Sequence, residues 1–258
     1  MKPLTAICVL VTCAAFTQQA AYAAQNYAEV QRVHFKTEKG LWSKAENWDL
    51  KKVPNGFMRA YIPAGSTVTV NSPVKITENI LLGSASTNAA TLYITRGAKI
   101  SVSQLALHGT FTNANGVVYM QGGELAVGND SEMRGMLMVG SESTCSGKAL
   151  VEISDGNFKG GITIGSVTQG KHTGVLKVIG SKPVITTNPK GRNFLRVNEF
   201  GTLEFVLDEK GVATMNYRAG RFVVDKGKII VDGRQYRGSS RKIALVIADS
   251  MENVPAVQ

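Results

Sequence analysis

Apolar and polar residues alternate along most of the chain beyond residue 60. Examples are Thr67-Val-Thr-Val70, Leu92-Tyr-Ile-Thr95, Leu150-Val-Glu-Ile153 and Leu203-Glu-Phe205. A period of two places successive side chains on opposite faces of a strand, so each run predicts a β-strand with one buried face. Almost no stretch shows helical periodicity, and short segments rich in Gly, Asn, Ser and Thr separate the runs. The pattern predicts an all-β protein.

Two glycine-containing patterns recur along the chain. The first is a short strand that ends at a glycine, and it occurs at Gly83, Gly128, Gly140 and Gly165. The second places apolar residues around a central glycine turn, and it occurs at Gly97, Gly123 and Gly156, with weaker copies around Gly180 and Gly201. The glycines of the second set recur at unequal intervals, the longest from Gly123 to Gly156 and the shortest from Gly180 to Gly201. This drifting period suits a solenoid whose loops vary in length.

A stack of coils explains why such short strands could be stable. A strand of a few residues cannot bury its apolar face alone, whereas stacked coils give each strand a partner above and below. We therefore predict a single-stranded parallel β-helix, that is, a β-solenoid, over residues 60–248, with about seven coils of roughly 24 residues. An antiparallel β-sandwich with Greek-key connections is the alternative, because short strands punctuated by glycine also suit it.

The two ends of the predicted solenoid depart from the repeating pattern. Residues 24–59 are expected to form a leader and an N-terminal cap that contains both tryptophans, Trp42 and Trp48. Their rings could form a stacking platform for sugars, but we favour a role in plugging the first open coil. At the other end, residues 242–248 form a continuous apolar strand pattern, and residues 249–258 are expected to be a flexible tail.

The N-terminal segment, residues 1–23, has the pattern of a secretory signal peptide. Lys2 precedes an apolar run over residues 4–16, and the small Ala21 and Ala23 fit a signal-peptidase site. We expect cleavage after Ala23 and no transmembrane anchor thereafter, because the apolar run is shorter than the roughly 20 residues that span a bilayer. The expected location is extracellular, on the cell surface or periplasmic. Cys145 would be the one cysteine left, so no internal disulfide is expected.

Positive charge is concentrated in the second half of the chain. The net charge of the whole chain is +10, of which residues 24–170 carry +2, residues 171–242 carry +9 and residues 243–258 carry −2. A basic half implies either a polyanionic partner or a solvated face. Because export makes nucleic acid an unexpected partner, an acidic polysaccharide or another cell-envelope polymer is the expected one.

Cationic residues of this half recur at intervals that stacked coils could bring into a ladder. Arginine binds carboxylate or sulfate groups through two parallel hydrogen bonds, which suits an acidic glycan. The candidate polyanion-binding residues are Lys190, Arg192, Arg196, Arg218, Arg221, Arg234, Arg237, Arg241 and Lys242, with Trp42, Trp48, Tyr217 and Tyr236 as candidate aromatic contacts. The alternative is a solubilising face that binds nothing.

The N-terminal part and the repeats together resemble a known group of proteins. The resemblance is carried by Leu41-Trp-Ser-x-x-x-Asn-Trp-Asp49, by Pro54-Asn55, by Ala60-Tyr-Ile-Pro-x-Gly-x-Thr-Val-Thr-Val70 and by the strands that end at glycine. These features resemble exported bacterial β-solenoid proteins related to autotransporter passenger repeats. The resemblance implies a surface or secreted role such as adhesion or glycan contact.

Candidate catalytic or metal-binding chemistry is sparse in the sequence. His34, His108 and His172 are scattered, without the clustering with Cys or carboxylates that transition metals require, so we expect no metal or other cofactor. We predict a secreted or surface-associated, non-catalytic protein, structural or adhesive, whose basic C-terminal half binds an acidic polysaccharide. The alternative is a polysaccharide lyase that acts on an acidic glycan, with Arg192, Arg196, Arg218 or Arg221 as its base. A purely structural role predicts self-association through exposed coil ends.

Overall fold

The structure is a computed structural model that describes ten stretches of the chain. They are residues 30–56, 58–76, 78–83, 88–102, 110–128, 135–140, 148–166, 173–186, 194–213 and 221–236. The chain divides into two compact units, Met1–Gln31 and Arg32–Gln258, and the fold described here is that of the second. The predicted signal peptide, the apolar strand at residues 242–248 and the tail at residues 249–258 lie outside the described residues.

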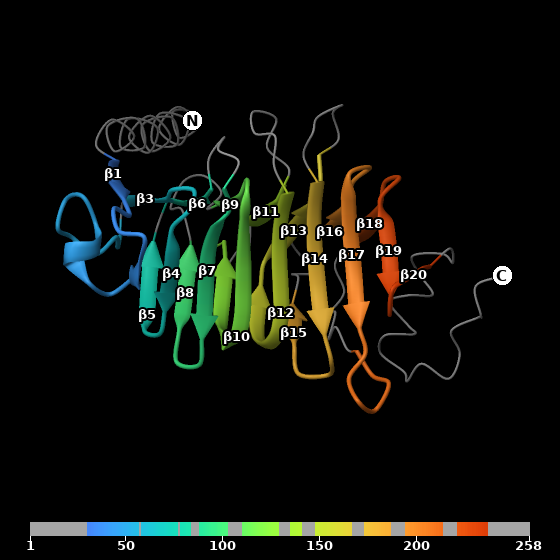
Figure 1. Cartoon of the computed structure of the whole chain (residues 1–258). Coiled ribbons are helices and arrows are strands. Elements are labelled where there is room, and N and C mark those ends of the chain that lie inside the picture. Colours follow the sequence, from blue (N-terminus) through green and yellow to red (C-terminus); the bar gives the residue numbers. More distant parts are fainter. Residues whose placement is uncertain are drawn as a thin grey trace, which may run out of the picture. The chain divides into compact units, whose positions relative to one another are not determined.

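Two sheets of stacked strands contain most of the described residues (Figure 1). Within these residues, the eight-stranded sheet has the order β1 (Gln31–His34), β3 (Met58–Ile62), β6 (Asn79–Leu82), β9 (Thr110–Asn113), β11 (Met136–Val139), β13 (Gly161–Ile164), β16 (Phe194–Val197) and β18 (Arg221–Val224). The main path of the twelve-stranded sheet is β2 (Lys39–Leu41), β4 (Thr67–Val70), β7 (Ala90–Thr95), β10 (Gly116–Val127), β12 (Lys148–Lys159), β14 (Thr173–Ile179), β17 (Gly201–Val206), β19 (Lys228–Val231) and β20 (Arg234–Gln235). Beside this path lie β5 (Pro73–Ile76), β8 (Lys99–Val102) and β15 (Val184–Thr186).

The strand pairing confirms the predicted parallel solenoid. All strand pairs whose register is described are parallel, except for the terminal hairpin of β19 and β20. This pairing excludes the antiparallel sandwich. The coils form a β-solenoid of about six turns, close to the predicted number. The length of the coils varies, as the drifting period predicted. From β3 onward, the number of residues between the starts of successive strands in the eight-stranded sheet is smallest from Met58 to Asn79 and largest from Gly161 to Phe194.

Equivalent inward residues of successive coils stack into continuous apolar ladders. In the twelve-stranded sheet, one such ladder consists of Val68, Leu92, Val118, Val151, Leu176 and Leu203, all of them fully buried. In the eight-stranded sheet, the corresponding ladder consists of Ile80, Phe111, Leu137, Ile162 and Leu195. The apolar half of each alternating strand therefore becomes one core that extends from coil to coil.

The glycines that end short strands allow the chain to turn between faces. Gly83, Gly128, Gly140 and Gly165 all have positive φ, between 62° and 110°, as the pattern predicted. At Gly140, an added Cβ would also lie only 2.5 Å from the carbonyl oxygen of Thr173. A side chain at this position is therefore opposed by the backbone conformation and by the neighbouring coil.

Both tryptophans belong to the core at the N-terminal end of the solenoid. Trp42 and Trp48 are 0% exposed, and their ring centroids lie 4.8 Å apart in an edge-on arrangement. The 3-10 turn η1 (Ala45–Asn47) precedes Trp48, whose Nε1 donates a hydrogen bond of 2.9 Å to the Trp42 carbonyl oxygen. The ring of Phe35 packs against that of Trp48, with the ring centroids 5.2 Å apart. The rings fill the core, and neither offers a face on which a sugar could stack.

Candidate functional site

Most of the predicted polyanion-binding residues lie outside the described part of the chain. Lys190, Arg192, Arg218, Arg237, Arg241, Lys242 and the aromatic candidate Tyr217 are in this group. Of Arg221, only the place in β18 is described. The described part of residues 171–242 holds eight Lys or Arg and six Asp or Glu. It therefore carries +2 of the net charge of +9 that residues 171–242 have in total. The remaining excess therefore belongs to segments that the structure does not describe.

Of the described candidates, Arg196 and Arg221 lie on the neighbouring strands β16 and β18 of the eight-stranded sheet, and Arg234 lies on β20 in the other sheet. Arg196 pairs in register with Thr163 and Val223, and its Nη2 lies 2.7 Å from Oδ2 of Asp225. Similar spacing in the sequence does not place residues in one column, because the coils differ in length.

Tyr236 is the fourth aromatic candidate, and its side chain is not an open platform. The ring is half-buried and packs against the apolar core. Its hydroxyl group is buried without a hydrogen-bond partner among the described residues. Tyr236 thus joins Trp42 and Trp48 as an aromatic residue that packs in or against the core.

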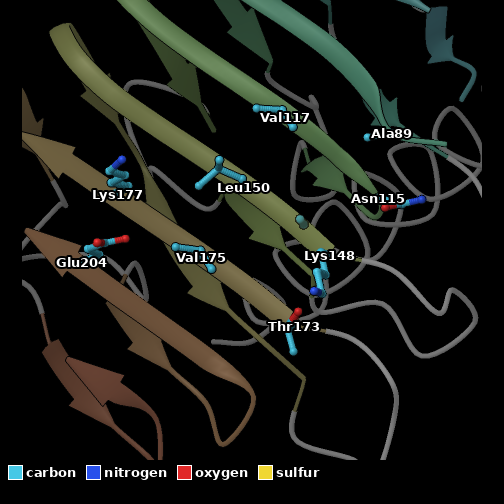
Figure 2. Close-up of a pocket in the computed structure, with 10 residues that line it drawn as sticks. Ala89, Asn115, Val117, Lys148, Leu150, Thr173, Val175, Lys177 and Glu204 are labelled. Atoms are coloured by element: carbon cyan, nitrogen blue, oxygen red, sulfur yellow. The ribbon is translucent and has the colours of Figure 1, made fainter. Parts of the chain in front are cut away.

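A groove lies on the outer face of the twelve-stranded sheet (Figure 2). Its volume is ≈ 740 Å³, and it extends across the neighbouring strands β10, β12, β14 and β17. Its lining consists of Ala89, Asn115, Val117, Lys148, Ala149, Leu150, Thr173, Val175, Lys177 and Glu204.

Three aliphatic side chains form the floor of the groove. Val117 on β10 pairs in register with Leu150 on β12, which pairs with Val175 on β14, and all three are half-buried. The same outward row continues with Thr91 on β7 and Thr202 on β17. The row is therefore polar at both ends of this stretch and apolar where it crosses the groove. We call Val117, Leu150 and Val175 the aliphatic row.

Polar residues border the aliphatic row on both sides. On one side lie Asn115, Lys148 and Thr173, and on the other lie Lys177 and Glu204 (Figure 2). The second side continues along the sheet, because Glu152, Lys177 and Glu204 pair with one another in register. Nζ of Lys177 lies 3.4 Å from Oε2 of Glu152. The groove thus combines an apolar floor with hydrogen-bonding walls of both charges.

Two stacked tyrosines extend the second wall toward the N-terminal coils. Tyr93 on β7 and Tyr119 on β10 pair in register, and Tyr119 pairs with Glu152. The ring centroids of the tyrosines lie 5.1 Å apart with an interplanar angle of 16°. Each ring therefore covers one face of the other, and the outer edges of the pair border the polar wall.

Asp208 lies in a turn next to the C-terminal coils, and three hydrogen bonds hold its carboxylate. The Oδ1 atom accepts hydrogen bonds from the backbone N–H groups of Val212, at 3.0 Å, and Lys210, at 2.9 Å. Ser181 donates a third hydrogen bond, of 3.0 Å, to Oδ2. The backbone bond from Val212, followed by the bonds from Ser181 and Lys210, holds the pKa of Asp208 below its usual range. The carboxylate fastens this turn to the turn at Ser181.

Among the described residues, no three or more His, Cys, Asp or Glu side chains gather as a metal ion would require. No helix in this part of the chain is long and apolar enough to cross a membrane. The fold and the groove define the class of protein, a parallel β-solenoid with an open groove on one sheet. No protein-family model, curated protein or solved structure matches the chain.

The alternating pattern did not predict the groove, although the components of the groove are visible in the sequence. Gly116-Val-Val-Tyr, Ala149-Leu-Val-Glu and Gly174-Val-Leu-Lys each place apolar residues at two adjacent positions, so both faces of those strands carry one. A strand that begins with apolar residues on both of its faces could have indicated an apolar patch on the outer face of the sheet. Strand register was needed to show that the three outward residues align.

Proposed function

We propose that the protein is a secreted or surface-associated, non-catalytic β-solenoid with a structural or adhesive role, and that it binds a polysaccharide in this groove. The observation that carries the proposal is the aliphatic row at an outward-facing position, bordered by polar walls. A few convergent polar groups around an apolar floor are the usual composition of a ligand site. Export is supported by the signal-peptide pattern of residues 1–23.

A linear polymer fits the geometry of a groove that crosses stacked strands. Neighbouring strands lie about 4.8 Å apart, which is similar to the length of one pyranose unit. An extended glycan that lies across the strands would meet an equivalent position at each coil. Its C–H groups would pack on Val117, Leu150 and Val175, and its hydroxyl groups would bond to the walls.

An acidic polymer remains our proposal for the basic C-terminal half, on the strength of its +9 charge. Such binding would weaken steeply with added salt, because exposed charges are screened. Binding on the aliphatic row would depend little on salt. The two parts of the proposal can therefore be separated in one experiment.

The test is retention of the protein on a panel of neutral and acidic polysaccharides at low and high salt. We expect salt-resistant retention that Leu150→Thr weakens and the matched change Val206→Thr does not. Val206 is the control because it is also outward and half-buried on the same sheet, but does not line the groove. Retention on no polysaccharide would overturn the proposal.

Two other outcomes would relocate or replace the proposed activity. Salt-sensitive retention that is lost with Arg218→Ala and Arg221→Ala, and kept with Leu150→Thr, would place binding in the basic half. Unsaturated uronate products that absorb in the ultraviolet would instead indicate the alternative function, a polysaccharide lyase. An additional assay of oligomeric state would detect the self-association that a purely structural role predicts.

A further inference from the structure

The floor of the groove is suited to small apolar groups rather than to flat sugar rings alone. Flat C–H faces of sugars pack best on open aromatic faces, whereas the floor consists of branched aliphatic side chains. The nearby rings of Tyr93 and Tyr119 stack on each other at 5.1 Å, so each covers one face of its neighbour. Between branched side chains, a methyl substituent finds a larger apolar contact than a bare ring does.

The walls offer both a hydrogen-bond donor and an acceptor on opposite sides of that floor. Lys148 lies on one side with an ammonium group that donates, and Glu204 lies on the other with a carboxylate that accepts (Figure 2). The neighbouring Lys177 pairs with Glu152 at 3.4 Å. No ion pair of Glu204 is present within the described residues. Lys148 on β12 and Glu204 on β17 belong to different coils, so a polymer that carries an N–H and a C=O on each unit would meet both walls.

The charge of the walls favours a neutral ligand. Lys148 and Lys177 are balanced by Glu204 and by Glu152 beside the groove. A polyanion would gain attraction from the lysines but meet repulsion from the carboxylates, and a polycation would meet the converse. Like-charge contacts of this kind select against the wrong partner more than they strengthen the right one.

A single sugar substituent combines all three properties. The acetamido group has a methyl group, an N–H donor and a C=O acceptor, and it carries no charge. Building on the proposed function, we infer that the groove binds a polymer of N-acetylated amino sugars. The methyl groups contact the aliphatic row, the amide N–H of one sugar unit donates to Glu204, and the carbonyl oxygen of another unit accepts from Lys148.

The test compares three β-1,4-linked oligosaccharides of equal length by calorimetry with the full chain: N-acetylglucosamine, glucosamine and glucose oligomers. We expect the acetylated oligomer to bind roughly tenfold more tightly than either of the others, which is the discrimination that one small apolar group can give. Val175→Thr should remove most of that preference. It is nearly isosteric and suits a strand, and Thr already occupies the same row at Thr91 and Thr202.

The controls keep failure of this inference separate from failure of the proposed function. Val206→Thr makes the same change outside the groove and should leave the preference intact. Unchanged circular dichroism of both variants would show that folding is retained. Equal affinity for acetylated and plain oligomers, with both lost in Leu150→Thr, would overturn the acetyl preference but keep a glycan-binding groove. Binding of none of the three, alongside retention on another polysaccharide, would also overturn the preference.

Discussion

Replacing Gly140 by alanine tests whether the coils approach one another as closely as the structure indicates. Gly140 has φ of 62°, and an added Cβ would lie 2.5 Å from the carbonyl oxygen of Thr173 and 2.8 Å from its carbonyl carbon. These atoms belong to the backbone of the next coil, so they cannot move aside as a flexible side chain would. The substitution therefore combines an unfavourable backbone conformation with a steric overlap.

The expected loss of stability follows from three contributions. The left-handed conformation costs a non-glycine residue about 1–2 kcal/mol, and overpacking against a fixed neighbour costs about 1–3 kcal/mol. Alanine also restricts the unfolded chain, which returns about 0.4–1 kcal/mol. The net effect of Gly140→Ala should be a decrease of about 1–4.6 kcal/mol in the free energy of unfolding.

Gly65→Ala is the matched control for this experiment. Gly65 has φ of 80° and a paired backbone N–H, but no atom lies within 4 Å of an added Cβ. Gly65→Ala should lower the free energy of unfolding by about 1 kcal/mol or less, since only the left-handed conformation and the restriction of the unfolded chain contribute. Urea unfolding followed by far-ultraviolet circular dichroism would measure both variants. Equal losses in the two variants would refute the close approach of the coils at Gly140.

Three further predictions concern the core, the cap and a turn. Leu176→Ala should lower the free energy of unfolding by about 2–5 kcal/mol in urea titration, because Leu176 is fully buried in an apolar ladder; a loss below about 1 kcal/mol would contradict that burial. Trp48→Ala should cost about 3–5 kcal/mol, and the wild-type tryptophan fluorescence should resist iodide quenching, whereas strong quenching would show an exposed ring. For Asp208, the folded pKa lies below the ordinary value of 3.8, so its stabilising effect is present above that pH and is lost as the pH falls through the folded pKa. The urea midpoint should thus fall on acidification below about pH 4, and less steeply in Asp208→Asn; identical profiles would contradict the role of this carboxylate.

The sequence alone predicted the stacked coils because this architecture is built from local, repeated patterns, but the strand pairing was needed to exclude the antiparallel sandwich. Alternation within each short strand showed which residues face the core, and glycines such as Gly140 and Gly165 marked where the chain turns. Short strands with repeated spacing have few stable arrangements other than stacked coils. The change of pattern around Trp42 and Trp48 set this segment apart from the repeats, and both rings are buried in the core.

The position of the site depended on the register between coils, which local patterns do not contain. The stretch of chain from Val117 to Leu150 is longer than the stretch from Leu150 to Val175, yet all three become neighbours because the intervening loops differ in length. Arg196 and Arg234 likewise lie on different sheets, which the sequence pattern did not indicate. Alternation determines which side of a strand a residue occupies, but backbone hydrogen bonds between coils decide which residue lies beside it. The inward face was therefore predictable from the sequence, whereas the groove on the outward face was decided by the tertiary structure.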